Sequence, residues 1–312
     1  MQAVDERIAR LERNMNQVIL GKPEVIRMCM VALLAGEHIL LEDVPGVGKT
    51  LAGKTLAKSI SGDFCRIQFT PDLLPSDILG SSIFNSNTSE FVFDKGPIFT
   101  NVVLADEINR APPRTQSALL EAMSDRQVSI DGHTYPLPNP FTVIATQNPF
   151  EFEGTYVLPE SQLDRFLLRV SMGYPARDYE RLVLSSHRNG EPVDQLQAVI
   201  TLDEVRALQT KTREVQFDDS ISDYVLSIAD MSRRSDQLSV GISTRGVLLW
   251  YRAAQALSLL HGRDFVVPDD VKQLAIPVLA HRVICKGDFR GGRGEEAKAV
   301  IQRILHDVPV PV

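Results

Sequence analysis

The clearest chemical signature in the sequence is a glycine-rich run that ends in a lysine and a threonine. Residues 42–50 read EDVPGVGKT, after a short apolar stretch and before a helix-like pattern. Backbone N–H groups at such a turn bind phosphate oxygens, and Gly46 and Gly48 let the backbone approach closely. Lys49 would reach the β- and γ-phosphates of a nucleotide, and the Thr50 hydroxyl would bind Mg²⁺. The residues expected to contact the nucleotide in this run are Pro45, Gly46, Val47, Gly48, Lys49, Thr50 and Leu51.

One position departs from the generic phosphate-loop pattern. Asp43 stands where that pattern has its first glycine. A carboxylate beside phosphates is unfavourable unless its side chain points away from them. Taken alone, the run could also be an ordinary glycine-rich turn between a strand and a helix.

Two acidic residues, Asp106 and Glu107, directly follow a second apolar stretch, residues 102–105. The carboxyl ends of parallel strands meet at one edge of a sheet, which would place this pair beside the phosphate loop. Asp106 would hold Mg²⁺ through its water shell, and Glu107 would polarise the attacking water. Paired acidic residues are common on protein surfaces, so this pair indicates a nucleotide site only in combination with the glycine-rich run.

A third apolar stretch, residues 142–145, leads into the polar residues Thr146, Gln147 and Asn148. Asn148 would lie between the first two motifs, where it could position the lytic water or contact the γ-phosphate. It could also be a turn residue before the proline that follows it.

These motifs require a parallel sheet with helices on both faces, and the first two-thirds of the chain has that pattern. The expected strands are residues 38–41, 66–69, 102–105, 142–145 and 166–170, and the expected helices are residues 23–35, 49–59 and 113–124. Two segments interrupt the alternation. Residues 84–93 suggest an extra hairpin or a loop insertion, and residues 127–137 contain an Asp131-Gly132 pair typical of a two-residue hairpin turn.

Helical periodicity replaces the strand pattern after residue 175. The expected helices are residues 177–187, 202–214, 219–231, 244–260 and 268–280. We therefore expect an α/β nucleotide-binding domain over residues 1–175 and a smaller all-helical lid domain over residues 176–312.

The composition is that of an ordinary globular protein. The chain has 312 residues, and 33 Lys plus Arg against 40 Asp plus Glu give a net charge of −7, which does not favour a nucleic-acid partner. The three cysteines form no CxxC pair, and the six histidines include none three to five residues apart, so neither disulfides nor a zinc site is expected. The longest strongly apolar run, residues 28–35, is too short to span a membrane, and the default compartment is the cytoplasm.

Longer motifs support a family resemblance. They are QFTPDLLPSDI at residues 68–78, KGPIF at 95–99, DEINRAPPRTQSALLEAM at 106–123, ATQNP at 145–149 and LPESQLDRF at 158–166. Over residues 18–283 the chain resembles the MoxR family of AAA+ ATPases. The resemblance implies an AAA+ P-loop core with a five-stranded parallel sheet and a small helical lid. It also implies that Asn148 is sensor 1, that residues 84–93 are the insertion at helix 2, and that residues 127–137 are the hairpin before sensor 1.

The resemblance also implies roles for further residues. Arg165 matches the arginine finger that reaches the γ-phosphate of a neighbouring subunit, and Arg245, within GISTRG at residues 241–246, matches sensor 2, which would contact the phosphates of its own subunit. Either could instead be an ordinary surface arginine. Gln68 is a candidate to restrain Glu107 until a partner binds. The segment that closes over the adenine comprises Val18, Ile19, Leu20 and Gly21.

The function expected from the family is Mg²⁺-dependent ATP hydrolysis in a homo-oligomeric, hexameric ring that remodels or matures partner protein complexes. A protein with a von Willebrand factor A domain is the expected partner. A nucleic-acid-linked or transcription-regulatory ATPase is one alternative, although residues 84–93 and 127–137 contain no Lys or Arg. An ATP-gated binding module with little turnover is another, although Glu107, Asn148 and Arg165 all have the residue types of an active enzyme.

Overall fold

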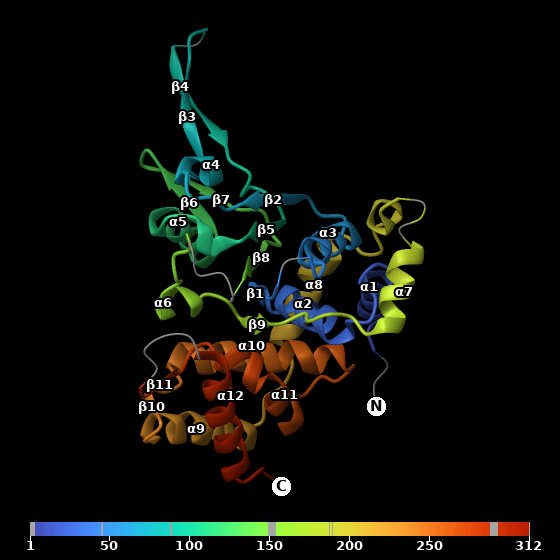
Figure 1. Cartoon of the computed structure of the whole chain (residues 1–312), viewed down its shortest axis with the longest axis vertical. Helices are drawn as coiled ribbons and strands as arrows, with labels where there is room; N and C mark the ends of the chain where they lie inside the picture. The colour runs from blue at the N-terminus through green and yellow to red at the C-terminus, as the bar shows by residue number, and fades with distance from the viewer. Residues whose placement is uncertain are drawn as a thin grey trace.

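The computed structural model describes residues 4–44, 46–87, 89–148, 154–186, 188, 190–287 and 293–311. An α/β part lies above a helical part, and a long hairpin projects from the α/β part (Figure 1). The centre of the α/β part is a sheet of five parallel strands in the order β2-β5-β8-β1-β9. The strands are β1 (Ile39–Glu42), β2 (Phe64–Gln68), β5 (Val102–Asp106), β8 (Thr142–Gln147) and β9 (Leu168–Val170). This confirms the predicted core sheet.

Helices cover both faces of the sheet, which explains why its strands are almost wholly apolar. Because side chains alternate along a strand, neighbouring residues enter different apolar clusters. Leu104 packs in the cluster that contains α2 (Pro23–Ala35) and α3 (Lys49–Ser59), whereas Val103 packs in the cluster that contains α5 (Pro113–Asp125). The other helical segments of this part are α1 (Glu6–Asn16), α4 (Pro75–Leu79), the 3-10 turn η1 (Ile108–Arg110) and α6 (Glu160–Leu163).

The segment around Asp131 forms the predicted two-residue hairpin. Strand β6 (Gln127–Ile130) pairs with β7 (His133–Pro136) in antiparallel register. Asp131 and Gly132 both have positive φ, 51° and 77°, as a tight hairpin turn of this kind requires.

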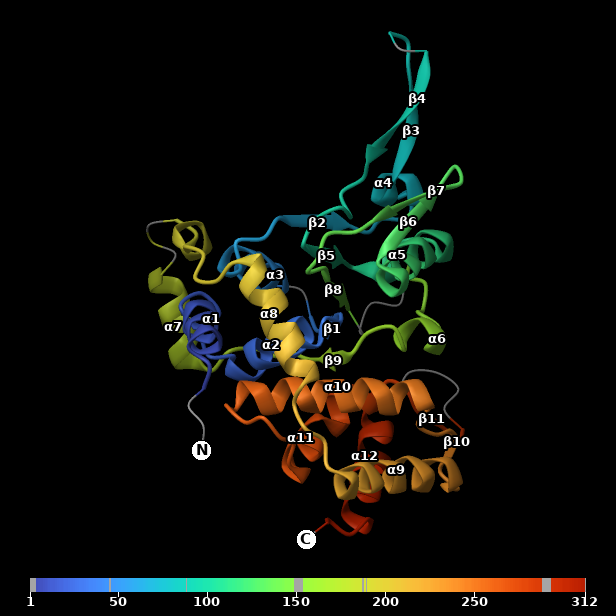
Figure 2. The ribbon, with the colours of Figure 1, turned by 180° about the vertical axis from the view of Figure 1, so that it is seen from behind.

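The second interruption is also a hairpin, and a longer one than the sequence suggested. Strand β3 (Gly80–Asn85) pairs with β4 (Glu90–Lys95), and both views show this hairpin projecting away from the sheet (Figures 1 and 2). Its strands carry exposed apolar side chains: the rings of Phe84 and Phe91 contact each other edge to face, and Phe91 is 74% exposed.

The helical part follows β9 in the chain. Between the two, α7 (Arg177–Ser186), the 3-10 turn η3 (Pro192–Gln195) and α8 (Leu202–Arg213) lie beside the α/β part (Figure 1). The helical part below it consists of α9 (Asp219–Arg234), α10 (Thr244–Leu260), α11 (Pro268–Leu279) and α12 (Arg293–Asp307). Helices α8 and α10 both pack on α2 of the α/β part, as Figure 2 shows from behind. The division of the chain at residue 175 stays a prediction.

The sequence interpretation missed two features of the helical part. One is α12, although Ala297, Val300, Ile301 and Ile304 have the spacing of one helix face and are buried. The other is a short antiparallel pair, β10 (Leu238–Val240) and β11 (Ile284–Cys285), whose strands are too short for periodicity to reveal. Among the described helices, none combines the length and the apolar character needed to cross a bilayer.

Candidate active site

The glycine-rich run forms the turn from β1 into α3. Gly46 and Gly48 have φ values of 85° and 95°, and Gly48 is the N-cap of α3. Residues with a side chain rarely adopt these backbone angles, so the turn depends on glycine at both positions. Lys49 and Thr50 are the first two residues of the helix. The structure therefore places both at a helix N-terminus, the geometry expected for phosphate binding; Pro45 lies outside the described residues.

The Lys49 ammonium lies deep in the turn. The side chain is buried, and Nζ donates a hydrogen bond of 2.6 Å to the backbone oxygen of Asp43. Burial lowers the pKa of Lys49, while the negative charges of Asp106, Asp43 and Glu107 act in the opposite direction. The Lys49 ammonium thus lies near acidic residues at the carboxyl ends of β1 and β5.

The carboxylate of Asp43 is directed toward the end of β9. Oδ1 accepts from the Val44 N–H at 2.8 Å, and Oδ2 accepts from Ser171 Oγ at 2.8 Å and from the Gly173 N–H. Burial raises the pKa of Asp43, but these hydrogen bonds outweigh it and hold the pKa below its ordinary value. The structure therefore accounts for the departure at this position, because the carboxylate ties the loop to β9.

Asp106 ends β5, and both of its carboxylate oxygens have hydrogen-bond partners. Thr146 Oγ1 donates to Oδ1 at 2.6 Å. Arg66 donates to Oδ2 from Nη2 at 2.6 Å and from Nε at 3.0 Å. Thr146 also accepts from the backbone N–H of Glu107 at 2.9 Å, so one hydroxyl orients both acidic residues.

Glu107 adopts a left-handed conformation, with φ 57° and ψ 49°. A non-glycine residue in this region costs about 1 kcal/mol or more, and such residues gather at functional sites. Its Oε2 accepts from Gln68 Nε2 at 2.8 Å and lies 3.1 Å from Arg110 Nε. The contact with Gln68 is the one that the sequence interpretation suggested.

Asn148 directly follows β8, the strand between β5 and β1 in the sheet. It is therefore at the same sheet edge as Asp106 and the phosphate loop. Its side chain is half-buried. The position agrees with the expected one, and its role stays a prediction.

Two adjoining cavities lie at this edge. The polar one, of about 510 Å³, is lined by residues that include Lys49, Thr50, Arg66, Asp106 and Glu107. The apolar one, of about 530 Å³, is lined by Val18, Ile19, Leu20, Lys22, Gly46, Val47, Gly48, Leu51, Met172, Tyr174, Pro175, Glu180, Val183 and Leu184. Both include Gly46, Gly48 and Leu51. A polar cavity continuous with an apolar one suits a phosphorylated ligand with an aromatic base.

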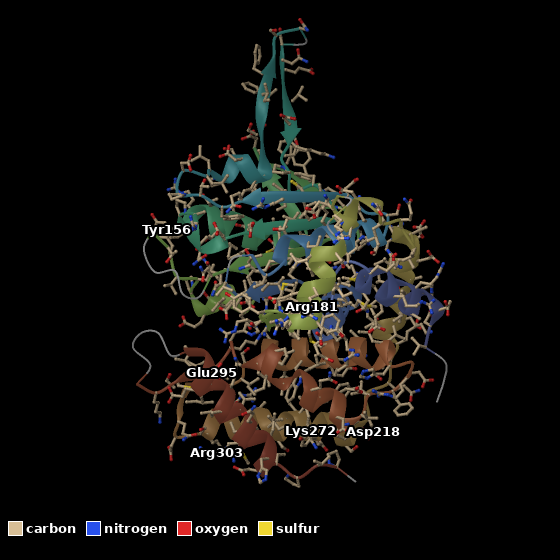
Figure 3. The ribbon with its side chains drawn as sticks, turned by 45° about the vertical axis from the view of Figure 1, so that its right-hand side comes forward. Tyr156, Arg181, Asp218, Lys272, Glu295 and Arg303 are labelled. Carbon is tan, nitrogen blue, oxygen red and sulfur yellow. The ribbon has the colours of Figure 1, made fainter. Side chains whose placement is uncertain are left out.

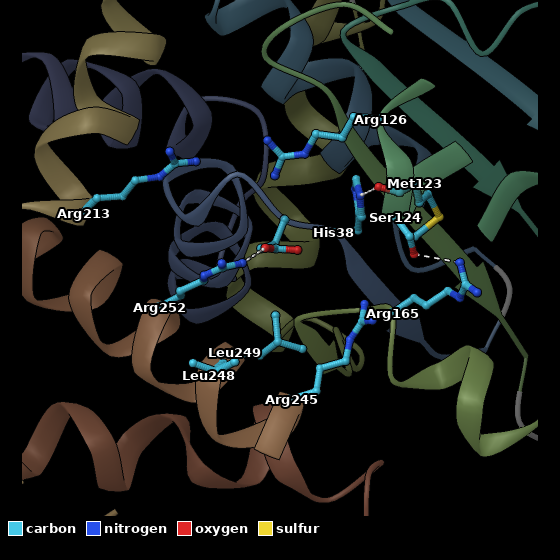
Figure 4. A pocket seen from close by; sticks show the side chains of 11 residues that line it. His38, Met123, Ser124, Arg126, Arg165, Arg213, Arg245, Leu248, Leu249 and Arg252 are labelled. Carbon is cyan, nitrogen blue, oxygen red and sulfur yellow. Dashed lines mark hydrogen bonds and ion pairs between the residues drawn. The ribbon is translucent and has the colours of Figure 1, made fainter. Parts of the chain in front are cut away.

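Arg165 lies elsewhere, in a cavity of about 480 Å³ between the α/β part and the helical part (Figure 4). Its Nη1 donates to Leu120 O and to Ser124 Oγ, each at 2.7 Å. The arginines that line this cavity, here named the arginine pocket, are Arg126, Arg165, Arg213, Arg245 and Arg252. Glu37, the one acidic residue in its described lining, pairs with Arg252 at 2.8 Å.

Arg245 is not where we expected it. We expected contact with the phosphates of its own chain, but Arg245 lines neither cavity at the phosphate loop. It extends from α10 toward Arg165, and its Nε lies 3.3 Å from Asp164 Oδ2 (Figure 4). The physical reason is the position of the helical part, which carries the start of α10 next to Asp164.

Comparison with known proteins shows the family of the chain. A family model described as "ATPase family associated with various cellular activities (AAA)" matches residues 38–168, and an "AAA lid domain" model matches residues 230–304. Chaperone MoxR1 of Mycobacterium tuberculosis is 41% identical, over 95% of this chain and 80% of the relative. The chain belongs to the MoxR family of AAA+ ATPases.

Other relatives of this MoxR-family chain align over nearly its whole length. An uncharacterized Bacillus subtilis protein, YeaC, is 48% identical over 98% of this chain and 95% of its own. Protein MoxR of Methylorubrum extorquens is 28% identical over 97% of this chain and 95% of its own. A crystal structure of a Cytophaga hutchinsonii protein superposes with a TM-score of 0.90 at 38% identity, covering 98% of this chain and 96% of that one.

The residues predicted for Mg²⁺ fit that ion in this MoxR-family chain. Thr50 and Asp106 line one cavity and offer a hydroxyl and a carboxylate, which are hard oxygen donors. Asp106 is also oriented by Thr146. Arg66, which the sequence interpretation did not identify, shares this cavity; its position two residues before Gln68 on one strand was the available signal.

Proposed function

We propose that the protein is a Mg²⁺-dependent ATPase whose active sites form between copies of the chain in a homo-oligomeric, hexameric ring. ATP would bind with its triphosphate at the glycine-rich loop and its base against Val18, Ile19 and Leu20. Hydrolysis would drive chaperone-like remodelling or maturation of partner protein complexes in the cytoplasm, and the name of the mycobacterial relative supports this role. A protein with a von Willebrand factor A domain is the proposed partner.

The separation of Lys49 from Arg165 is the observation that carries this proposal. Among the described residues, the polar cavity at the phosphate loop and the arginine pocket share no lining residue. The described lining of the arginine pocket has five arginines and one glutamate, in a chain whose net charge is −7. Such a pocket suits a polyanion, and the phosphates of a neighbouring copy's nucleotide have the required charge.

The residues of the chain have defined roles in this reaction. Backbone N–H groups of the loop and Lys49 bind the phosphates, while Thr50 and Asp106 hold Mg²⁺. Bound Mg²⁺ would neutralise charge on the phosphate oxygens. Glu107 accepts a proton from water as the water oxygen bonds to the γ-phosphorus and the bond to the β–γ bridging oxygen breaks, giving ADP and phosphate. Asn148 positions that water, and Arg165 and Arg245 of the adjacent copy stabilise the developing negative charge.

Phosphate release from Mg·ATP, measured across a range of protein concentrations, tests the proposal. Specific activity is expected to rise with concentration, because only the assembled chain has complete sites. Glu107→Gln and Arg165→Ala are each expected to reduce it by at least about 10²-fold. Arg303→Ala removes an arginine on α12 of the helical part, remote from the sheet (Figure 3), and is expected to keep full activity.

Mixing two inactive variants separates action between copies from action within one copy. Lys49→Ala lacks the phosphate site and Arg165→Ala lacks the finger, so neither is expected to hydrolyse ATP alone. If Arg165 serves the neighbouring site, a mixture contains some interfaces with both residues intact and regains part of the activity. The shared site is contradicted if the mixture stays inactive although the two variants co-assemble. It is also contradicted if activity does not depend on concentration and is insensitive to Arg165→Ala.

A further inference from the structure

Arg66 lies on β2, an edge strand of the sheet, and it faces the predicted metal site. β2 pairs with β5 in parallel, and the register places Gln68 opposite Asp106. Because side chains alternate along a strand, Arg66 and Gln68 project from the same face. The Arg66 side chain is 49% exposed, because β2 is the outermost strand of the sheet in the described part of the chain. It lines the polar cavity together with Lys49, Thr50 and Lys54.

The contacts of Arg66 join the two acidic residues of the site. Its Nε and Nη2 both donate to Asp106 Oδ2, at 3.0 and 2.6 Å. Nη2 also donates to Gln68 Oε1 at 2.8 Å, and Gln68 Nε2 donates to Glu107 Oε2 at 2.8 Å. A continuous path of hydrogen bonds therefore runs from Asp106 through Arg66 and Gln68 to Glu107.

The contact of Arg66 competes with metal binding at the same carboxylate. Oδ1 of Asp106 is bound by Thr146, and Oδ2 is bound by Arg66. A guanidinium and a hydrated divalent cation repel each other, and both are attracted by the negative charge of the Asp106 carboxylate, so they compete for it. Since Arg66 is half-exposed and already lines the cavity, it can leave Asp106 without disturbing the core and turn toward a bound nucleotide's phosphates.

We propose that Arg66 is a positioning residue that competes with Mg²⁺ for Asp106 and, through Gln68, keeps Glu107 hydrogen-bonded until Mg²⁺ and nucleotide displace it. This inference rests on the proposed function. When Arg66 leaves Asp106, Gln68 loses the donor that orients its amide, and its hold on Glu107 weakens. Binding of the metal would thereby be coupled to release of the residue that polarises water.

Binding of Mn²⁺, a paramagnetic substitute for Mg²⁺, tests the competition without hydrolysis. With ADP equimolar to the protein, the free Mn²⁺ signal in electron paramagnetic resonance, compared with that of ADP alone, gives the metal affinity of the site. Arg66→Gln is expected to raise this affinity about three- to tenfold, because charged hydrogen bonds to the carboxylate are removed. Arg66→Lys keeps the charge but not the paired donors, and an intermediate affinity is expected.

Arg110→Gln is the matched control, because Arg110 contacts Glu107. If loss of any nearby positive charge strengthens metal binding, Arg66→Gln and Arg110→Gln will have equal effects, and the inference is overturned. Unchanged affinity in Arg66→Gln, with ADP binding and folding intact, overturns it as well. Failure of the unaltered chain to bind ADP would instead contradict the proposed function.

A double-mutant cycle on turnover tests the coupling to Glu107. Gln68→Ala and Arg66→Gln are expected to change the basal hydrolysis rate non-additively, because both act through one path of hydrogen bonds. Additive effects would show that Arg66 does not act through Gln68 and would overturn that half of the inference.

Discussion

Arg282 of the helical part donates a hydrogen bond of 2.8 Å from Nε to Oδ1 of Asp164, the residue that precedes Arg165. The Arg282 side chain is 1% exposed. Burial lowers the pKa of Arg282 to about 10, while the negative charge of Asp164 opposes the shift. The same carboxylate lies 3.3 Å from Arg245. A single acidic residue, one position before Arg165, thus pairs with two arginines of the helical part.

Arg282→Met is expected to lower the free energy of unfolding by about 2–4 kcal/mol, because it removes one partner of a largely buried ion pair. Urea unfolding followed by the fluorescence of Trp250, the single tryptophan, measures this change. The folded variant is also expected to lose ATPase activity that depends on Arg165. Arg263→Met breaks the Arg263–Asp270 pair inside the helical part and serves as the control. Equal activity in the two folded variants would contradict a role for Arg282 in placing Arg165.

Gln68→Ala is expected to raise the basal rate of ATP hydrolysis about two- to tenfold. The reason is that the substitution removes the 2.8 Å hydrogen bond that holds Glu107, and a bond to a charged group is worth about 1.5–3 kcal/mol before solvent screening. Steady-state phosphate release measures the basal rate, and Gln237→Ala in the helical part is the control. A lower rate would show that Gln68 assists Glu107 rather than restraining it.

Asp43→Gly would restore the generic loop pattern, and we expect it to reduce stability. Ser171, Gly173 and Val44 all donate to this carboxylate, and their loss is expected to cost about 1–3 kcal/mol. Ser171→Ala removes one of these bonds and is expected to cost less. Thermal unfolding with and without ADP compares the variants. If Asp43→Gly were as stable as the parent and bound ADP more tightly, the carboxylate would not stabilise the loop and would weaken nucleotide binding.

Two buried histidines make stability depend on pH. Burial lowers the pKa of His281 well below 6.5, with the charge of Arg282 adding to the effect, and burial also lowers the pKa of His38. Below pH 6.5 the unfolded chain therefore binds more protons than the folded chain. Stability is full above pH 6.5 and is lost as pH falls, by at most about 1.4 kcal/mol per pH unit for each histidine.

Urea unfolding of the parent chain at pH 8, 7, 6 and 5.5 measures this slope. His281→Gln is expected to make the slope shallower, because glutamine does not titrate. His306→Gln alters a histidine whose side chain is 90% exposed and is expected to leave the slope unchanged. Identical slopes for the parent and His281→Gln would rule out His281 as a source of the pH dependence.

Local signals predicted much of this molecule. Helices α2, α3 and α10 have the bounds that their periodicity indicated, and the Asp131-Gly132 turn was predicted from its residue types. These features depend on residues a few positions apart. By contrast, Arg66 and Asp106 are separated by 40 positions, and only strand pairing brings them together.

The sequence by itself determined the family, the alternation of core strands with helices, and which residues carry the phosphate-binding and acidic motifs. The tertiary structure alone decided where side chains point and which distant elements share a cavity. It turned Asp43 toward Ser171, placed Arg66 on Asp106, and carried Arg245 to Arg165 instead of to the phosphate loop. Periodicity and turn chemistry are short-range properties, whereas these contacts depend on how whole elements pack.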